Sequence, residues 1–245
     1  MPQIRLYGIP LSHPVVAARG MLDVKGLPYR YIELLAGLHP PALLAVGFRG
    51  LTVPAIKLSD GRPVQGSLAI AQALEEVAPE PSLYPADPAA RRAAQDAERW
   101  GEAVLQPVPR RIIRWGLAHR FSQRRWFAEV GSPLPAPAVT AVVMSPLVPL
   151  FARQVGASEE RVRRDLAQLP GLLDEVDRLL ADGVIGADPP GAADFQIACS
   201  VRMLLAMDDV AAVVAGRPAE AFARRAIPEY WRIPAALPPE WRPAT

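Results

Sequence analysis

Cysteine is nearly absent from this chain of 245 residues, since Cys199 is the only one. A single cysteine excludes a disulfide within the chain, a zinc site built from cysteines and a paired-cysteine redox centre. The three histidines do not show the spacing of metal ligands, so no bound metal is expected. The scarcity of cysteine favours a reducing compartment, and a lone cysteine in a predicted helix is typical of a small core residue.

The chain also has little excess of either charge sign, because it contains 27 basic and 25 acidic residues and its net charge is only +2. Nucleic-acid binding proteins are usually more basic, and we therefore expect no nucleic-acid partner. The apolar share of 51% is enough to form a core. The composition predicts a globular protein of one large or two smaller domains.

The longest stretch without charge, residues 131–152, could cross a bilayer by its length. Prolines would leave too many backbone groups unpaired in lipid, so we expect no membrane partner and instead a buried or cleft-covering loop with a short helix. The first residues lack the basic and apolar parts of a secretory signal, which predicts a cytoplasmic protein. The prolines of this stretch are Pro133, Pro135, Pro137, Pro146 and Pro149.

The first 80 residues follow an α/β pattern. Short alternating or apolar runs predict strands, and the residues between them at 59–62 are typical of a hairpin turn. Pro14 and Ser67 are typical of helix starts. The pattern predicts strands at 4–7, 29–34, 53–58 and 63–65, helices from 14 to 25 and over 67–77, and a loop or short helix within 37–52.

After a proline-rich linker the periodicity becomes helical, with no convincing strand. We expect the segment 228–245 to be extended, with Trp231 and Trp241 packed against the body of the protein. The predicted helices cover about 88–105 and 110–129, one begins after Ser158, and two more cover 171–182 and 192–207.

The first half contains three informative motifs. They are Leu6-Tyr7-Gly8-Ile9-Pro10-Leu11-Ser12 before a helix, Val53-Pro54 before a strand, and Gly66-Ser67-Leu68-Ala69-Ile70. Together they resemble the glutathione S-transferase superfamily, and the first is similar to the active-site loop of its serine-type phi and theta-like classes. The resemblance implies a thioredoxin-like α/β domain at 1–80, a linker at 81–88, an all-α domain at 89–227 and a proline-rich tail at 228–245.

Ser12 is the candidate catalytic residue. A thiol is mostly protonated at neutral pH, and a hydroxyl beside the amino end of a helix would stabilise the thiolate. Two alternatives stay open: Ser12 only satisfies backbone amides before the helix, or Tyr7 supplies the hydroxyl, as in tyrosine-type transferases. Val15 and Val16 occupy the region where cysteine-type relatives carry a thiol, so disulfide exchange by an enzyme thiol is not expected.

The resemblance implies that glutathione lies along the other two motifs. A cis Pro54 would expose the backbone of Val53 to the cysteinyl part of the tripeptide, and Ser67 would hold the γ-glutamyl carboxylate. Gly66 departs from the family, which usually has Glu or Gln there. Gln65 is one residue away, and strand alternation points it to the opposite face. A different thiol is therefore an alternative.

The remaining candidates are assigned by their place relative to these motifs. His39 and Arg49 are candidates for the glycine carboxylate of glutathione, and His13 is expected at the surface or packed in its loop. In the helical domain, Arg111 and Trp115 are candidates for the second-substrate pocket.

These features predict a glutathione S-transferase-like enzyme that activates the thiol of glutathione for attack on an apolar small-molecule electrophile. The resemblance implies a role in detoxification and a homodimer, with glutathione as co-substrate and no metal. The alternatives are a non-catalytic ligand carrier or interaction protein of the same fold, or a transferase that uses a different thiol.

Overall fold

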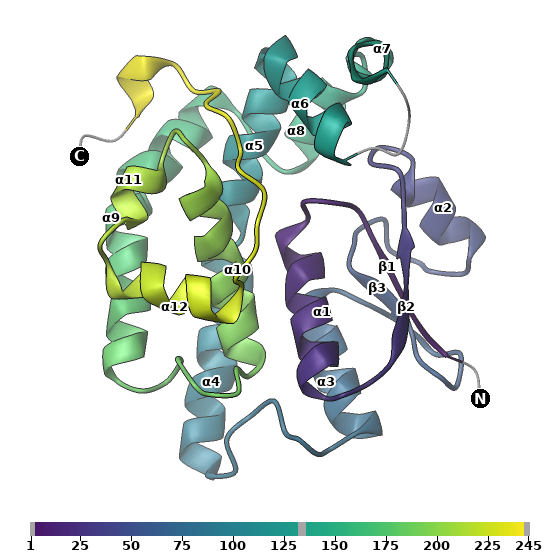
Figure 1. The fold of residues 1–245 in the computed structure, drawn as a ribbon, viewed down its shortest axis with the longest axis vertical. Helices are drawn as coiled ribbons and strands as arrows, with labels where there is room; N and C mark the ends of the chain where they lie inside the picture. Colours follow the sequence, from purple (N-terminus) through teal and green to yellow (C-terminus); the bar gives the residue numbers. More distant parts are fainter. Residues whose placement is uncertain (1–2, 132–135, 243–245) are drawn as a thin grey trace.

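The computed structural model describes residues 3–131 and 136–242. Its first part is a four-stranded mixed sheet of order β2-β1-β3-β4, in which β1 and β2 are parallel and the other pairs antiparallel (Figure 1). The predicted order of strands and helices is confirmed, and the loop or short helix is a helix. The elements are β1 (Ile4–Gly8), α1 (His13–Val24), β2 (Tyr29–Glu33), α2 (His39–Ala45), β3 (Ala55–Lys57), β4 (Pro63–Gln65) and α3 (Ser67–Val77).

The two faces of this sheet are covered by different helices because side chains of a strand alternate. Leu6 of β1 belongs to the core that includes Leu22 of α1 and Ile70 of α3. Its neighbour Tyr7 belongs to a separate cluster with Leu43 of α2. The sheet is therefore a layer between α1 and α3 on one side and α2 on the other, as in thioredoxin-like domains.

The second part of the chain is helical and packs against α1 (Figure 1). Its central helix is α10, all 15 residues of which are buried, as expected for a helix with neighbours on every side. The helices are α4 (Pro88–Trp100), α5 (Pro107–His119), α6 (Phe121–Gly131), α7 (Pro137–Met144), α8 (Val148–Gln154), α9 (Glu159–Ala181), α10 (Ala192–Ala206), α11 (Ala211–Val214) and α12 (Pro218–Ala226), with a π-helical turn η1 (Gly101–Leu105) and a 3-10 turn η2 (Pro239–Trp241).

Two helix predictions are corrected by the structure. The helix predicted over 110–129 is interrupted at Arg120, whose φ of −122° and ψ of 117° are extended. The helices predicted after Ser158 and over 171–182 are the single helix α9, which contains Pro170. An apolar stripe continues across this proline, since Leu169 and Leu173 are both fully buried, and its packing holds the helix together.

The uncharged stretch at 131–152 contains more helix than expected. Instead of a loop with one short helix it contains α7 and α8, while residues 132–135 lie outside the described part. In the described ranges, none of the helices is both long and apolar enough to cross a membrane.

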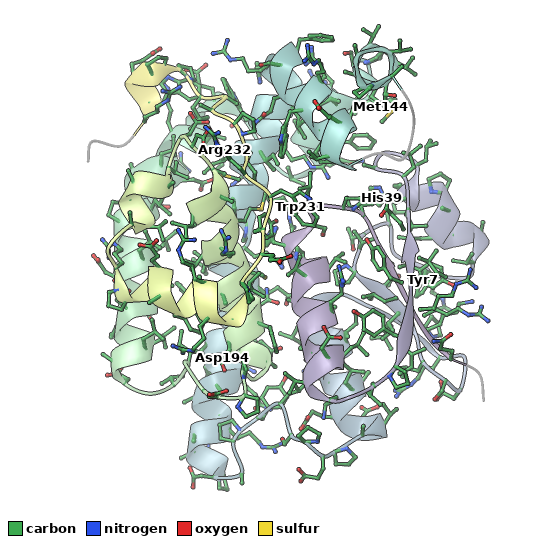
Figure 2. The ribbon with its side chains drawn as sticks, viewed as in Figure 1. Tyr7, His39, Met144, Asp194, Trp231 and Arg232 are labelled. Carbon is green, nitrogen blue, oxygen red and sulfur yellow. The ribbon has the colours of Figure 1, made fainter. Side chains whose placement is uncertain are left out.

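The final segment runs in extended form from α12 back along α10 and then past α5 (Figure 1). Trp241 packs on Trp115 with 4.8 Å between ring centroids, as predicted. The same expectation is wrong for Trp231, which is 39% exposed (Figure 2). Its neighbour Tyr230 instead reaches inward, and the hydroxyl of Tyr230 donates to the carbonyl of Leu11 at 2.8 Å.

Candidate active site

A cavity of about 600 Å³ lies between the sheet domain and the helical part. One wall is formed by the loop 9–14 after β1, the start of α2, the segment 51–54 and the junction of β4 with α3. The other wall is formed by η1, α5, α6, α8 and α10. The three motifs found in the sequence therefore meet in one cavity.

Ser12 lies in this cavity at the N-cap position of α1, and its hydroxyl makes no capping hydrogen bond. Its carbonyl oxygen accepts from the amides of Val15 and Val16 at 2.9 and 3.1 Å. Pro14 has no amide hydrogen to satisfy. The first turn of α1 thus uses the backbone of Ser12 and leaves its hydroxyl beside the positive end of the helix dipole.

Leu11 fixes how the chain enters this turn. Its φ of 66° lies in the left-handed region, which non-glycine residues seldom adopt. The carbonyl of Leu11 accepts the hydrogen bond from the hydroxyl of Tyr230. The final segment of the chain therefore supports the backbone next to Ser12.

The Val53–Pro54 peptide is cis, as predicted, and Val53 lines the cavity. Within the described part of the chain, the amide and carbonyl of Val53 form no hydrogen bond. The Pro54 carbonyl accepts from the amide of Gly66 at 3.0 Å. Gln65 points away from the cavity and holds the preceding loop, because its side chain accepts from the Gly50 amide at 2.7 Å and donates to the Gly50 carbonyl at 3.0 Å.

Gly66 and Ser67 begin α3 at the cavity wall. Gly66 has a φ of 90°, and a Cβ atom there would meet nothing within 4 Å, so the backbone angle rather than space favours glycine. The hydroxyl of Ser67 donates to Oε1 of Gln196 in α10 at 2.7 Å, while Nε2 of Gln196 is buried without a partner among the described residues. If the amide of Gln196 were reversed, it would donate to Ser67 and free the hydroxyl hydrogen for a carboxylate.

Both histidines of the cavity wall are held neutral. His39 accepts from the Gly37 amide through Nδ1 at 3.3 Å, so Nε2 carries the hydrogen. Burial and then the charge of Arg114 lower the pKa of His39 to about 4. His13 is 3% exposed, so of its two expected positions it has the packed one, and burial followed by the charge of Arg110 lowers its pKa to about 3. Each is an uncharged hydrogen-bonding group.

Besides Gln65, four of the candidate residues lie outside the cavity. Tyr7 is buried between the sheet and α2, and Arg49 is exposed. Arg111 and Trp115 lie on other faces of α5: Arg111 pairs with Asp165 of α9, and the buried Trp115 packs between His119 of its own helix and Trp241 of the final segment. These four are therefore not carried into the proposed mechanism.

The structure adds two residues that the sequence interpretation did not select, Arg110 and Arg114. They lie on the face of α5 that lines the cavity, together with Ile113 and Leu117. This spacing, at intervals of three and four residues, is the usual signal of one helix face. Arginines occur on more than one face of α5, so the sequence did not distinguish them.

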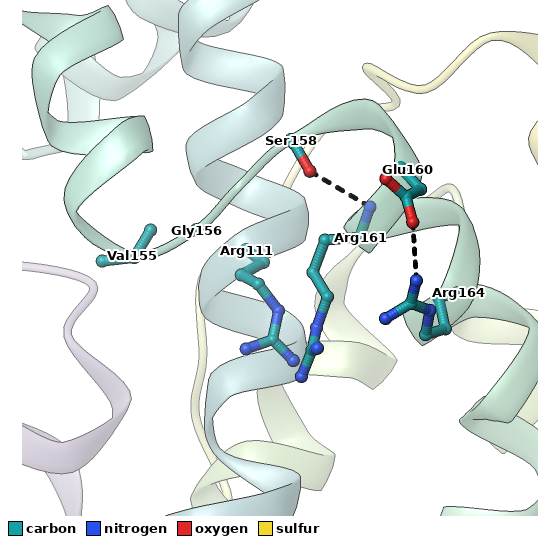
Figure 3. Close-up of a pocket in the computed structure, with 7 residues that line it drawn as sticks. All are labelled: Arg111, Val155, Gly156, Ser158, Glu160, Arg161 and Arg164. Atoms are coloured by element: carbon teal, nitrogen blue, oxygen red, sulfur yellow. Dashed lines mark hydrogen bonds and ion pairs between the residues drawn. The ribbon is translucent and has the colours of Figure 1, made fainter.

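A second, smaller cavity of about 330 Å³ lies beside the start of α9 and includes three arginines (Figure 3). Arg164 pairs with Glu160 at 2.6 Å. Asp165 of the same helix pairs with Arg111 at 2.5 Å and with Arg161 at 3.6 Å. Each arginine of this cavity therefore has a carboxylate partner within the protein, with Asp165 shared by two of them.

The mouth of the larger cavity is approached by α7 and α8. Phe151 of α8 lines the cavity. Met144 of α7 contacts the loop before α2, where a Cβ atom on Gly37 would overlap its terminal methyl group, and Figure 2 shows Met144 above the part of the chain that carries His39. The uncharged stretch thus covers part of the cavity, as expected from the sequence.

Comparisons with known proteins agree with these features. The family model described as "Glutathione S-transferase, N-terminal domain" matches residues 6–82. A probable glutathione S-transferase, GSTU6 of Oryza sativa subsp. japonica, is 36% identical over 111 residues, which are 43% of this chain and 47% of that protein. The match thus spans about half the length of this curated relative.

Solved structures extend the similarity to nearly the whole chain. Glutathione transferase F7 from Populus trichocarpa has a TM-score of 0.61 at 18% identity, with 91% of this chain and 92% of that chain covered. The Tau class transferase MiGSTU from mango, Mangifera indica L., has a TM-score of 0.58 at 19% identity, covering 99% and 93%. At such identities the likeness shows the fold. Residues 6–82 thus match the N-terminal domain family of glutathione S-transferases, and the chain as a whole shares the fold of the solved glutathione transferases.

Proposed function

We propose that this protein is a glutathione-dependent transferase in which Ser12 stabilises the thiolate. The thiol proton leaves to water, the Ser12 hydroxyl donates to the sulfur anion, and the sulfur attacks an electrophilic carbon. A carbon–sulfur bond forms while the leaving group departs with its bonding electron pair. The observation that carries this proposal is the uncommitted hydroxyl of Ser12 at the N-terminus of α1, inside the cavity.

The glutathione position follows from the groups left open on the same wall. The amide and carbonyl of Val53 would pair with the cysteinyl backbone, as a strand edge does. The γ-glutamyl carboxylate would accept from the amide and hydroxyl of Ser67, where α3 begins. The Nε2–H of His39 would donate to the glycine carboxylate. In this proposal residues 1–80 are the thiol-binding domain, and 81–88 link it to the helical domain at 89–227.

Replacement of Ser12 by alanine tests the proposal. The assay follows conjugation of glutathione to chlorodinitrobenzene, a neutral aryl halide that releases chloride. A hydrogen bond to an anion contributes about 1.5–3 kcal/mol, so Ser12→Ala is expected to lower kcat at neutral pH by about 10- to 100-fold. The loss is expected to shrink as rising pH ionises the thiol without help.

Ser122→Ala is the matched control, since Ser122 is exposed on α6 outside the cavity. Calorimetry should give similar glutathione dissociation constants for Ser12→Ala and the wild type, because the serine acts on ionisation rather than on tripeptide binding. Unchanged turnover in Ser12→Ala would overturn the assignment of this residue.

Gly66 favours a second candidate, in which the same site binds another thiol or a ligand without turnover. The family contact for the γ-glutamyl end is missing at this position, and Gln65 is engaged with the loop before Val53. Titration of glutathione into the wild-type protein decides between the two. Absence of binding up to millimolar glutathione would favour the second candidate.

The homodimer implied by the family remains a proposal. Sedimentation at micromolar concentration tests it, and a monomer there would contradict it.

A further inference from the structure

We infer that the helical wall of the cavity binds an anionic group of the second substrate through Arg110 and Arg114. The inference rests on the proposed transferase function, and it specifies the acceptor as an apolar or aromatic molecule that bears an acid group. It changes the expectation from the sequence, which was a purely apolar electrophile.

The two guanidinium groups share one face of α5 at an interval of four residues, so they are neighbours on the helix surface. Arg110 donates to Oε1 of Gln106 at 2.8 Å. Arg114 lies over the ring of Phe151, with 5.9 Å from its guanidinium carbon to the ring centroid. Both side chains are thus held in the cavity by neutral partners.

Neither arginine has a carboxylate partner within the residues that the structure describes. The neighbouring cavity shows the contrast, because Arg111 there pairs with Asp165 at 2.5 Å and Arg164 with Glu160 at 2.6 Å. A partly buried guanidinium without an anion is costly, since it loses hydration and gains no ion pair. A ligand carboxylate would supply the missing partner in the larger cavity.

The charges that face this cavity leave a positive excess. Its charged lining groups are Arg110, Arg114 and the carboxylate of Glu102, so two positive charges meet one negative charge. His13 and His39 are neutral, with their pKa values lowered to about 3 and about 4. Burial and then Arg110 lower the pKa of Arg114 to about 10, which still leaves it protonated at neutral pH.

The surroundings of the arginines define the rest of the acceptor. Apolar side chains from α5, α6, α8 and α10 line the same wall, and two of them are aromatic. Such a wall favours a flat hydrophobic body with its acid group on the arginines. These residues are Ile113, Leu117, Phe127, Phe151 and Met203.

A matched pair of acceptors tests the inference: neutral chlorodinitrobenzene and its carboxylate, chlorodinitrobenzoate. In both, the glutathione sulfur bonds to the ring carbon and chloride leaves, while the carboxylate of the second takes no part in the reaction. Each rate is divided by the uncatalysed rate of the same acceptor. The wild type is expected to favour the carboxylate.

Arg114→Met is expected to lower kcat/KM for chlorodinitrobenzoate by about 10- to 100-fold, mainly through KM, because one charge-assisted hydrogen bond is lost. The loss with the neutral acceptor should be much smaller, because that acceptor brings no anion to Arg114. Arg114→Lys should restore part of the preference because the positive charge remains. Arg164→Met is the control, because Arg164 lies at the smaller cavity and pairs with Glu160, and it should keep the wild-type preference.

Two results would overturn the inference while leaving the transferase proposal intact. One is an equal loss for both acceptors. The other is a raised KM for glutathione with an unchanged acceptor preference, which would assign Arg114 to the glycine carboxylate of the tripeptide.

If the wild type conjugates neither acceptor, the transferase proposal fails, and calorimetry with unreactive dinitrobenzoate tests the anion site alone. Binding by the wild type that is lost in Arg114→Met and partly restored in Arg114→Lys would support the anion site. Equal binding by the wild type and Arg114→Met, or none, would overturn it.

Discussion

Glu98→Gln is expected to stabilise the protein at alkaline pH and to leave its stability unchanged in acid. Glu98 lies in α4 and is 2% exposed, and its carboxylate accepts from the hydroxyl of Tyr84 at 2.7 Å. Burial raises the pKa of Glu98 from 4.5 to about 7, although the Tyr84 hydrogen bond opposes this shift. The folded protein therefore binds this proton more tightly than the unfolded chain does.

The sign and size of the effect follow from linkage. Because the folded pKa of Glu98 is raised, its stabilising contribution is complete below a pH of 4.5 and is lost as pH rises through about 7. At about 1.4 kcal/mol for each pKa unit, the loss amounts to roughly 3 kcal/mol. Glutamine carries no charge at any of these pH values and can still accept from Tyr84.

Urea unfolding of the wild type and the variant near pH 4 and near pH 8 measures this difference. The free energy of unfolding of Glu98→Gln should exceed that of the wild type only at the higher pH. Glu129→Gln is the control, because Glu129 is exposed on α6 and should show no such pH dependence. A difference between variant and wild type that is equal at both pH values would refute the reasoning.

Further substitutions test the packing and the support of the active-site loop. In α1, Gly20→Ala would place a Cβ atom 2.6 Å from Cδ1 of Phe195, and such overpacking should lower the free energy of unfolding by about 1–3 kcal/mol. Gly171→Ala in α9, where nothing lies within 4 Å of the new atom, should raise it by up to about 1 kcal/mol, and urea unfolding compares the two. Tyr230→Phe removes the hydrogen bond to the Leu11 carbonyl and should cost about 1 kcal/mol of stability while lowering kcat more than glutathione affinity. Equal kcat in wild type and Tyr230→Phe would contradict the supporting role of that hydroxyl.

The strands, the helices around them and the helical second half could be predicted because their signals are local. Alternation, turn residues and helix starts lie within a few positions of one another. The errors arise where packing against residues far away in the sequence determines whether a helix continues or ends. Pro170 looks like a break, yet α9 continues through it because Leu169 and Leu173 are buried against other helices.

The residues of the cavity were likewise predicted only in part. Short motifs sufficed to predict that the segments of Ser12, Val53 and Ser67 belong together. The helical wall was predicted one residue out of register, with Arg111 in place of Arg110, and one residue rotates a side chain by about 100° around a helix. Only the three-dimensional position of Asp165, which pairs with Arg111, shows which face of α5 turns away from the cavity.

The hydrogen bond between Tyr230 and Leu11 joins residues that are 219 positions apart. A ribosome completes the sheet domain long before it releases Tyr230, so the loop next to Ser12 lacks this support until almost all of the helical domain has been synthesised. Contacts of such long range also form late in folding, because the entropy of closing a large loop must first be overcome. The support of this loop is thus a late step in the maturation of the protein, and an unfinished chain would carry the Ser12 loop without it.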